Sequence, residues 1–231
     1  MIVYQDLNSA TFKDVTPLQK VPAMHLGCGR NIWESNVILQ YVEDKFGHLG
    51  APQTTLESPE DMAFVELLCR THDIYIASPN CTQPGFAHTQ GCMYLAPYET
   101  AHCPAERAMD RASRAAKLAE IWKQLCWLEA SMRGPCLAGD HVTNADFTWF
   151  PTCTFMEYML PRVFGWPEVF RESNHFPRLT KWYTKLDANP VFGQVRREIW
   201  GYWEMKDKEG QFDPIRAETL DTTFQWKYPQ L

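Results

Sequence analysis

Two pairs of neighbouring residues near the N-terminus, Val21-Pro22 and Glu34-Ser35, could together bind a small peptide. Apolar residues at helical spacing after Ser35 predict a helix that begins at Glu34 and Ser35 and ends near Gly47. The first turn of a helix offers unpaired N–H groups and a partial positive charge, which suit a carboxylate. Val21 is held extended by the proline after it and, if their peptide bond is cis, could present its N–H and C=O like a sheet edge.

The same residues carry a family resemblance. Val21-Pro22, Trp33-Glu34-Ser35 and Ile38-Leu39-Gln40-Tyr41 resemble the second half of the thioredoxin-like domain of glutathione S-transferases. In that family the residue before the cis-proline pairs with the cysteinyl backbone of glutathione, and the acidic-serine pair holds its γ-glutamyl end. The resemblance implies glutathione as a ligand or co-substrate, held by Val21, Pro22, Glu34 and Ser35, with Lys20 near its glycyl carboxylate.

The residue that would activate the glutathione sulfur has no evident counterpart. In the family it is a Tyr, Ser or Cys between a first strand and a first helix, whereas only twenty residues precede Val21 here and resemble the family's second strand. A thiol with a pKa of about 8.5 is mostly protonated at neutral pH, so conjugation needs a hydrogen-bond donor to the sulfur. The candidates are Ser9, Tyr4 and Cys28, although a structural interpretation is favoured for each: Ser9 as a turn residue, Tyr4 as a strand residue and Cys28 as a hairpin thiol.

Composition indicates a globular protein: 231 residues are 45% hydrophobic, and the net charge is −6. The acidic balance argues against a nucleic-acid partner, which would need a clustered basic face. No run approaches the roughly 20 apolar residues of a membrane span, and the N-terminus lacks a basic-then-apolar leader. Eight cysteines without CxxC pairs favour a reducing compartment. We expect a cytoplasmic protein, or an organelle interior if a targeting segment was removed.

Changes in composition divide the chain. The Gly-, Pro- and Thr-rich stretch before Ser58 is typical of a linker. We expect a thioredoxin-like domain over residues 1–50, a linker over 51–57, an all-helical domain over 58–200 and an aromatic-containing tail over 201–231. The resemblance covers residues 1 to about 200. It implies an α+β N-terminal thioredoxin-like domain, incomplete and lacking its first strand and helix, followed by an all-α C-terminal domain.

Periodicity predicts the individual elements. Residues 1–7 fit a strand, 12–18 a connector, and helices are expected over 58–76, 104–132, 147–160 and 176–190, with a short last helix before residue 201. The helix over 147–160 is apolar nearly all round and should be central and buried. In the helix after Ser35, one face is predicted to be buried: Ile38, Tyr41, Val42 and Phe46.

Other polar residues admit both structural and functional interpretations. Thr143 and Asp146 fit a capping box, a structural role. His72 and Tyr75 could line a substrate pocket, although a satisfied core or interface position is the favoured interpretation of His72. Arg107, Arg111 and Arg114 fit a solvated face paired with Asp110 and Glu106, or a dimer contact. The ligand types His88, Cys92, His102 and Cys103 match no metal-site spacing, so we expect no metal and a long loop over 77–103 instead.

Three interpretations of the function remain open. In the first, the resemblance implies an enzyme that conjugates glutathione thiolate to a small hydrophobic electrophile, as in detoxification, and forms the family's usual homodimer. In the second, the fold is a catalytically inactive scaffold or a subunit of a larger assembly, with the aromatic tail and the 77–103 loop as contact surfaces. A module like the transferase-like domain of translation elongation factor 1 gamma is a third interpretation.

Overall fold

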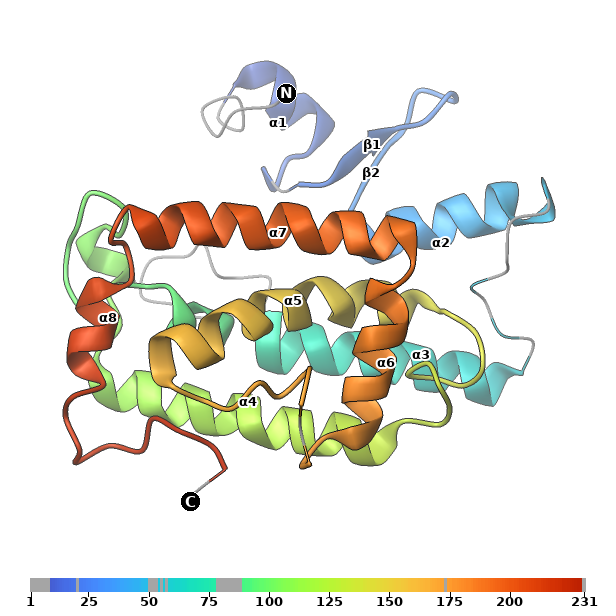
Figure 1. Cartoon of the computed structure of the whole chain (residues 1–231). Coiled ribbons are helices and arrows are strands. Elements are labelled where there is room, and N and C mark those ends of the chain that lie inside the picture. The colour runs from blue at the N-terminus through green and yellow to red at the C-terminus, as the bar shows by residue number, and fades with distance from the viewer. Residues whose placement is uncertain are drawn as a thin grey trace. The chain divides into compact units, whose positions relative to one another are not determined.

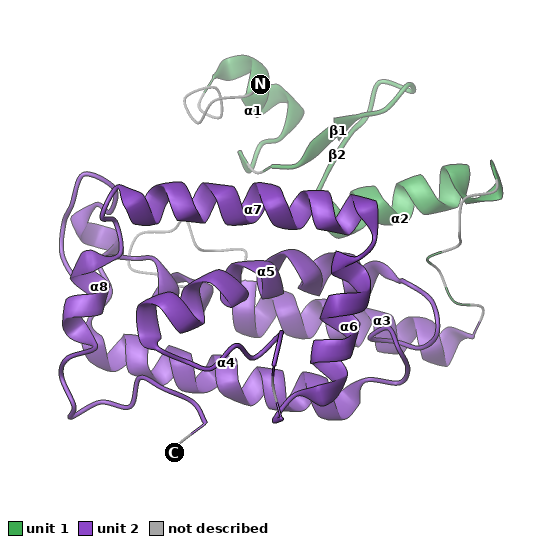
Figure 2. Cartoon of the chain, viewed as in Figure 1, with its two compact units in different colours: residues 1–57 green, residues 58–231 purple. Residues whose placement is uncertain are grey.

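The structure is a computed structural model of the chain that describes residues 9–19, 21–49, 54, 56, 58–77, 89–172 and 174–229. The chain divides into two compact units, residues 1–57 and 58–231 (Figure 2). The strand expected over residues 1–7 lies outside the described residues, as do Tyr4 and Lys20.

In the described part of the first unit there are two α-helices and a two-stranded hairpin (Figure 1). Its elements are α1 (Ala10–Val15), β1 (Ala23–His25), β2 (Asn31–Trp33), α2 (Ser35–Phe46) and a 3₁₀ turn (Gly47–Leu49). The connector expected over residues 12–18 is therefore partly helical. Helix α1 begins after Ser9, whose hydroxyl accepts a hydrogen bond from the Phe12 N–H at 3.2 Å.

Glycines shape the hairpin. The strands are antiparallel, with Ala23 opposite Trp33 and His25 opposite Asn31. At the tip the Leu26 N–H donates to the Arg30 carbonyl at 2.8 Å, and Gly29 has a φ of +83°, which a side chain would strain.

The predicted bounds of α2 are confirmed, but its predicted burial is wrong. No residue of α2 is buried, and Val42 and Phe46 are 37% and 45% exposed. Among the described residues of the first unit, the sheet has only two strands, which is too little surface to cover a helix face. Apolar spacing indicated a helix correctly, but it does not by itself supply a covering partner.

The second unit is all-helical. Its α-helices are α3 (Pro59–His72), α4 (Arg111–Ser131), α5 (Asn144–Phe164), α6 (Pro177–Asp187), α7 (Pro190–Lys208) and α8 (Asp213–Glu218). A π turn (Asp73–Ala77) extends α3, and 3₁₀ turns cover Thr89–Met93 and Ala105–Arg107. None of the described helices combines the length and apolarity needed to cross a membrane.

Helix α5 is the centre of this unit, as its sequence predicts. It packs against α3, α7 and α8, and Figure 1 shows it between α7 and the layer of α3 and α4. Trp149 and Phe150 have no exposed surface. The helix predicted over residues 176–190 is also present, as α6, and it buries Leu179, Trp182, Tyr183 and Leu186.

Two predicted boundaries differ from the structure. Helix α4 begins at Arg111 rather than near residue 104, because the Asp110 carboxylate caps it by accepting from the Ser113 N–H at 2.9 Å. At the other end, α7 continues to Lys208 and α8 follows. Phe212 and Ile215 are fully buried. Much of the segment expected to be a tail is therefore part of the helical core.

Candidate functional site

The hairpin register brings the two residue pairs of the N-terminal unit to the same end of the sheet. Ala23 lies opposite Trp33. Val21 and Pro22 immediately precede the first of these residues, and Glu34 and Ser35 immediately follow the second. Because antiparallel strands pair residue by residue, the segment before β1 and the start of α2 are neighbours.

This end of the hairpin is open. Val21 is 59% exposed, and Pro22, Glu34 and Ser35 are exposed as well. The Val21-Pro22 peptide bond is cis. Among the described residues, no backbone group hydrogen-bonds to the N–H or C=O of Val21. An extended peptide could therefore pair with this segment as with the edge of a sheet.

Glu34 combines an unusual backbone with a side chain that does not cap its own helix. Its φ of 73° and ψ of 121° lie in a region that residues with a side chain rarely occupy. It is the N-cap of α2, yet its side chain makes no capping hydrogen bond. The N–H groups of the first turn and the Glu34 carboxylate are both at hand for a ligand that carries a carboxylate and an ammonium group.

The three candidates for thiol activation lie in different places. Tyr4, like the proposed ligand contact Lys20, falls outside the described residues. Ser9 caps α1, and its hydroxyl accepts a hydrogen bond from the Phe12 N–H. Cys28 is exposed at the tip of the hairpin, the end opposite Val21 and Ser35. This geometry argues against Cys28 as the group that contacts a peptide thiol at the other end.

His72 and Tyr75 do not share a surface. His72 is only 6% exposed. One ring nitrogen lies 3.0 Å from the Asp73 carboxylate and the other 2.8 Å from the Thr152 hydroxyl, so the ring joins α3 to α5. Tyr75 is 48% exposed. The position of His72 is thus that of a satisfied core residue, and Tyr75 alone presents a ring to the surface.

Asp146 holds the start of α5. Its carboxylate accepts hydrogen bonds from the Thr143 N–H at 2.8 Å, the Leu137 N–H at 3.1 Å and the Trp182 indole at 2.7 Å. The Thr143 hydroxyl lies 3.1 Å away. Burial raises the pKa of Asp146, and these donors oppose the rise by favouring the ionised form. The contacts with Leu137 and Trp182 come from outside the capping motif and have no local sequence signal.

The prediction of a solvated arginine row is wrong for Arg114. Its side chain has no exposed surface, and its Nε donates to the Glu218 carboxylate at 2.8 Å. Its remaining N–H groups donate to the carbonyls of Cys92, Leu95 and Met109. Arg111 is half exposed and pairs with Glu218 and Asp221 rather than with Asp110 or Glu106. The partner helix α8 is distant in the chain, so no local spacing indicated this arrangement.

A second buried ion cluster was also missed. Glu157 of α5 is 2% exposed and accepts from Arg171 at 2.5 Å, Arg196 at 2.9 Å and the Tyr183 hydroxyl at 2.8 Å. Burial, followed by the Glu157 charge, raises the pKa of Tyr183. These bonds tie α5 to α6 and α7, so the cluster is structural.

The ligand-type residues of the long loop do not form a metal centre in the part of the chain that is described. There, no three His, Cys, Asp or Glu side chains converge as metal ligands. Cys92 and Cys103 are buried, and burial raises the pKa of Cys92 to about 12. His88 lies outside the described residues.

Two family models match the sequence. Residues 2–45 match the glutathione S-transferase N-terminal domain, and residues 88–190 match the glutathione S-transferase C-terminal domain. Together these ranges include more than half of the chain and agree with a small α/β unit followed by an all-helical one. The chain belongs to the glutathione S-transferase superfamily. No curated protein sequence matches it.

Solved structures support the same fold. Isozyme E7 of the Drosophila melanogaster glutathione S-transferase is 18% identical with a TM-score of 0.63, over 89% of this chain and 80% of that one. A glutathione S-transferase-like protein from Lodderomyces elongisporus is 17% identical with a TM-score of 0.64, over 85% and 81%. The theta-class enzyme of Xanthomonas axonopodis pv. citri, solved with glutathione bound, is 19% identical with a TM-score of 0.59, over 82% and 78%.

Proposed function

We propose that this protein binds glutathione at the open end of its hairpin and transfers the glutathione thiolate to a small hydrophobic electrophile. The observation that carries the proposal is the placement of exposed Val21 beside the start of α2 by the Ala23–Trp33 register. Glutathione has the matching groups: a backbone amide for the Val21 edge, and an α-carboxylate and ammonium for Ser35 and Glu34.

In the reaction the glutathione thiolate sulfur forms a bond to an electrophilic carbon. In a substitution a leaving group departs from that carbon, and in an addition the neighbouring carbon accepts a proton. The peptide contacts would supply proximity by fixing the sulfur. A hydroxyl that donates a hydrogen bond to the sulfur would lower the pKa of the thiol and raise the thiolate fraction. Ser9 and Tyr4 are the proposed donors.

The test is calorimetric titration of the full chain with reduced glutathione. Ser35→Ala removes a hydroxyl at the start of α2 and is expected to weaken binding about 10-fold, the usual scale for a hydrogen bond to a charged group. Ser131→Ala, at the last residue of α4, is the matched control and should leave the affinity unchanged. If Ser35→Ala and Ser131→Ala bind reduced glutathione with the same affinity, the proposed site is overturned.

Glu34 gives a second test of the same site. Glu34→Gln preserves the side-chain length and removes the charge opposite the glutathione ammonium, so affinity should fall. Glu34→Gly also removes the charge, but glycine tolerates a φ of 73°, so this variant should unfold at a higher temperature than Glu34→Gln. A Gln variant with native affinity would exclude Glu34 as a ligand contact.

Turnover separates the enzyme from the inactive scaffold. The conjugation rate with an activated aryl halide should exceed the rate in buffer and should fall in Ser35→Ala. The scaffold alternative is favoured by the exposed Val37, Val42 and Phe46 of α2, which a second copy of the chain could cover. Glutathione binding without turnover, together with a dimeric or larger mass by light scattering, would establish that alternative.

A further inference from the structure

A thiol and an amine from distant parts of the chain meet in the helical unit. Cys136 lies in the loop before α5, and Lys185 lies in the last turn of α6. The Lys185 nitrogen is 3.4 Å from the Cys136 sulfur, although the two residues are 49 positions apart in the sequence. Two nucleophiles at this distance can be joined once one of them is oxidised to an electrophile.

A single carboxylate holds the two elements that carry this pair. Asp146 accepts a hydrogen bond from the N–H of Leu137, the residue after Cys136. It also accepts from the indole of Trp182, three residues before Lys185 in α6. The backbone on both sides of the pair is therefore anchored to the same group, whereas the exposed side chain of Lys185 is free to adjust its position.

The Lys185 side chain is also one of the groups that cover the sulfur. It makes no ion pair with a described carboxylate, and its ammonium group donates to Cys136, which has no exposed surface. Burial, followed by the charge of Asp146, raises the pKa of the Cys136 thiol, and the hydrogen bond from Lys185 opposes the rise. The thiolate, which is the reactive form, is therefore favoured by alkaline pH.

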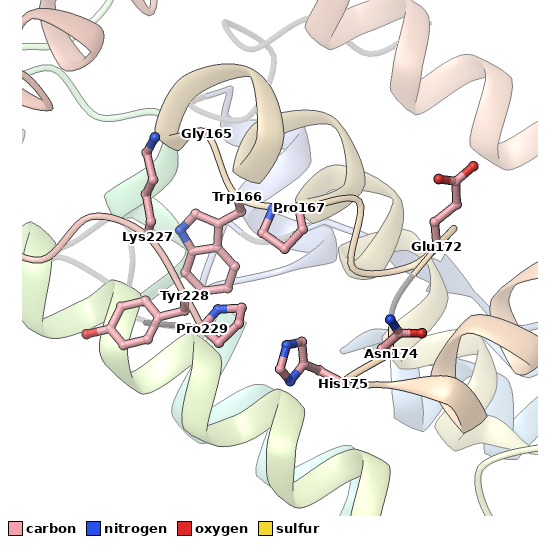
Figure 3. A pocket seen from close by; sticks show the side chains of 9 residues that line it. All are labelled: Gly165, Trp166, Pro167, Glu172, Asn174, His175, Lys227, Tyr228 and Pro229. Carbon is pink, nitrogen blue, oxygen red and sulfur yellow. The ribbon is translucent and has the colours of Figure 1, made fainter. Parts of the chain in front are cut away.

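Lys227 gives a contrast within the same unit. It is exposed, as Lys185 is, and it lines a pocket beside the end of α5. None of the described residues that line this pocket is a cysteine. Figure 3 shows the Lys227 side chain extending toward Gly165, where its nitrogen would be 3.1 Å from an added Cβ. Lys227 is therefore a matched control for a lysine that contacts a thiol.

We propose that a peroxide joins Cys136 and Lys185 through a sulfur–nitrogen bond, as a sulfenamide. In the first step the Cys136 thiolate attacks a peroxide oxygen, the O–O bond breaks and water leaves, so the sulfur is oxidised by two electrons to a sulfenic acid. In the second step the neutral Lys185 amine attacks this sulfur. The S–N bond forms, the S–O bond breaks, and the hydroxide leaves as water with the proton of the amine. One thiol, one amine and one hydrogen peroxide thus give one sulfenamide and two waters.

The cross-link has two physical consequences. It ties the loop before α5 to α6 and restricts the unfolded chain as a disulfide does, so the oxidised protein should unfold at a higher temperature. Its formation should be slow at pH 7 and faster at pH 9, because the peroxide reacts with the thiolate and the amine attacks in its neutral form.

The test is treatment of the full chain with millimolar hydrogen peroxide at pH 9, followed by alkylation, digestion and mass spectrometry. The peptides that carry Cys136 and Lys185 should be joined and lighter by about 2 Da than their sum, because two hydrogens are lost. Dithiothreitol should separate them. Lys185→Arg should give no joined peptides and should carry Cys136 as a sulfinic acid, whereas Lys227→Arg should cross-link like the native chain.

Thermal unfolding gives a second readout. The oxidised native protein should unfold about 5 °C or more above the equally oxidised Lys185→Arg variant, and the reduced forms of the two should unfold at similar temperatures. Three results would each overturn the proposal: an unmodified Cys136 after peroxide at pH 9, a Cys136 sulfinic acid without joined peptides in the native chain, or Cys136 cross-linked as efficiently in Lys185→Arg. Glutathione takes no part in this test, so its outcome is independent of the hairpin site.

Discussion

Arg114 is a charged side chain with no exposed surface, so its lost hydration must be offset by its partners. Glu218 neutralises the charge, and three backbone carbonyls accept hydrogen bonds from the two terminal nitrogens. These carbonyls belong to the segment before α4, whereas Glu218 ends α8. One side chain therefore joins three separate parts of the helical unit.

Replacing Arg114 with Met should destabilise the protein strongly. The change removes the buried partner of the Glu218 carboxylate and leaves it only the half-exposed Arg111 guanidinium, 3.5 Å away. Loss of one partner of a buried ion pair costs about 3–5 kcal/mol. Thermal and urea unfolding followed by circular dichroism would measure the loss. Arg111→Met, at a side chain that is 52% exposed, is the control and should cost at most about 1 kcal/mol.

The double variant Arg114→Met with Glu218→Leu should recover part of this loss, because it removes both charges. Similar unfolding curves for the two single arginine variants would contradict the role given to Arg114.

At the scale of residues, sequence showed which side chains could be charged partners but not which would be buried. Arg114 follows Asp110 at the spacing of a surface pair, and its true partner lies 104 residues away. The opposite holds for Val21 and Ser35. They are close because a short glycine-containing hairpin separates them, and such local geometry is visible in sequence.

Among the connecting elements, the loop from Arg133 to Asp140 depends on two glycines. The Arg133 N–H donates to the Leu137 carbonyl at 3.1 Å, and the Cys136 N–H donates to the Gly139 carbonyl at 2.9 Å. A Cβ on Gly134 would lie 2.4 Å from the Gly139 oxygen. The loop positions Leu137, whose N–H reaches Asp146 at the start of α5.

Gly134→Ala should therefore destabilise the helical unit by about 2 kcal/mol or more, since backbone rather than a flexible side chain must move. Gly201→Ala is the matched control: Gly201 lies in α7 with open space around its Cα. There alanine should stabilise by about 0.5–1 kcal/mol. Differential scanning calorimetry would compare the two, and a shift of the same sign in both would refute this account of the loop.

Element prediction succeeded where a helix has one clear apolar face and a partner to cover it. Leu179, Trp182 and Leu186 define α6 in this way. In α2 the same pattern predicted the helix correctly but predicted a buried face that the structure does not show. The segment after Trp200 was predicted to be a tail, whereas it continues α7. Polar residues such as Lys206 and Lys208 concealed that helix end.

At the scale of the whole molecule, buried thiols make the free energy of unfolding depend on pH in the alkaline range. Burial raises the pKa of Cys69 to about 11 and that of Cys92 to about 12, from an ordinary value of 9.0. Between pH 9 and these raised pKa values, the unfolded chain releases thiol protons that the folded chain retains. The stability contributed by these thiols is complete below pH 9 and is lost as pH rises toward 11 or 12.

The unfolding temperature should therefore fall between pH 9 and pH 11, and the double variant Cys69→Ala with Cys92→Ala should show a shallower fall. At pH 8 iodoacetamide should label exposed Cys28 and Cys126 in the native protein and spare Cys69 and Cys92, as read by mass spectrometry. An unchanged slope in the double variant would show that other groups control the alkaline transition.

The Arg114–Glu218 pair also sets an order of events during synthesis. The arginine is translated 104 residues ahead of its carboxylate, so the nascent chain must keep its guanidinium hydrated while most of the helices emerge from the ribosome. Native packing around Arg114 can therefore close only after α8 has been translated.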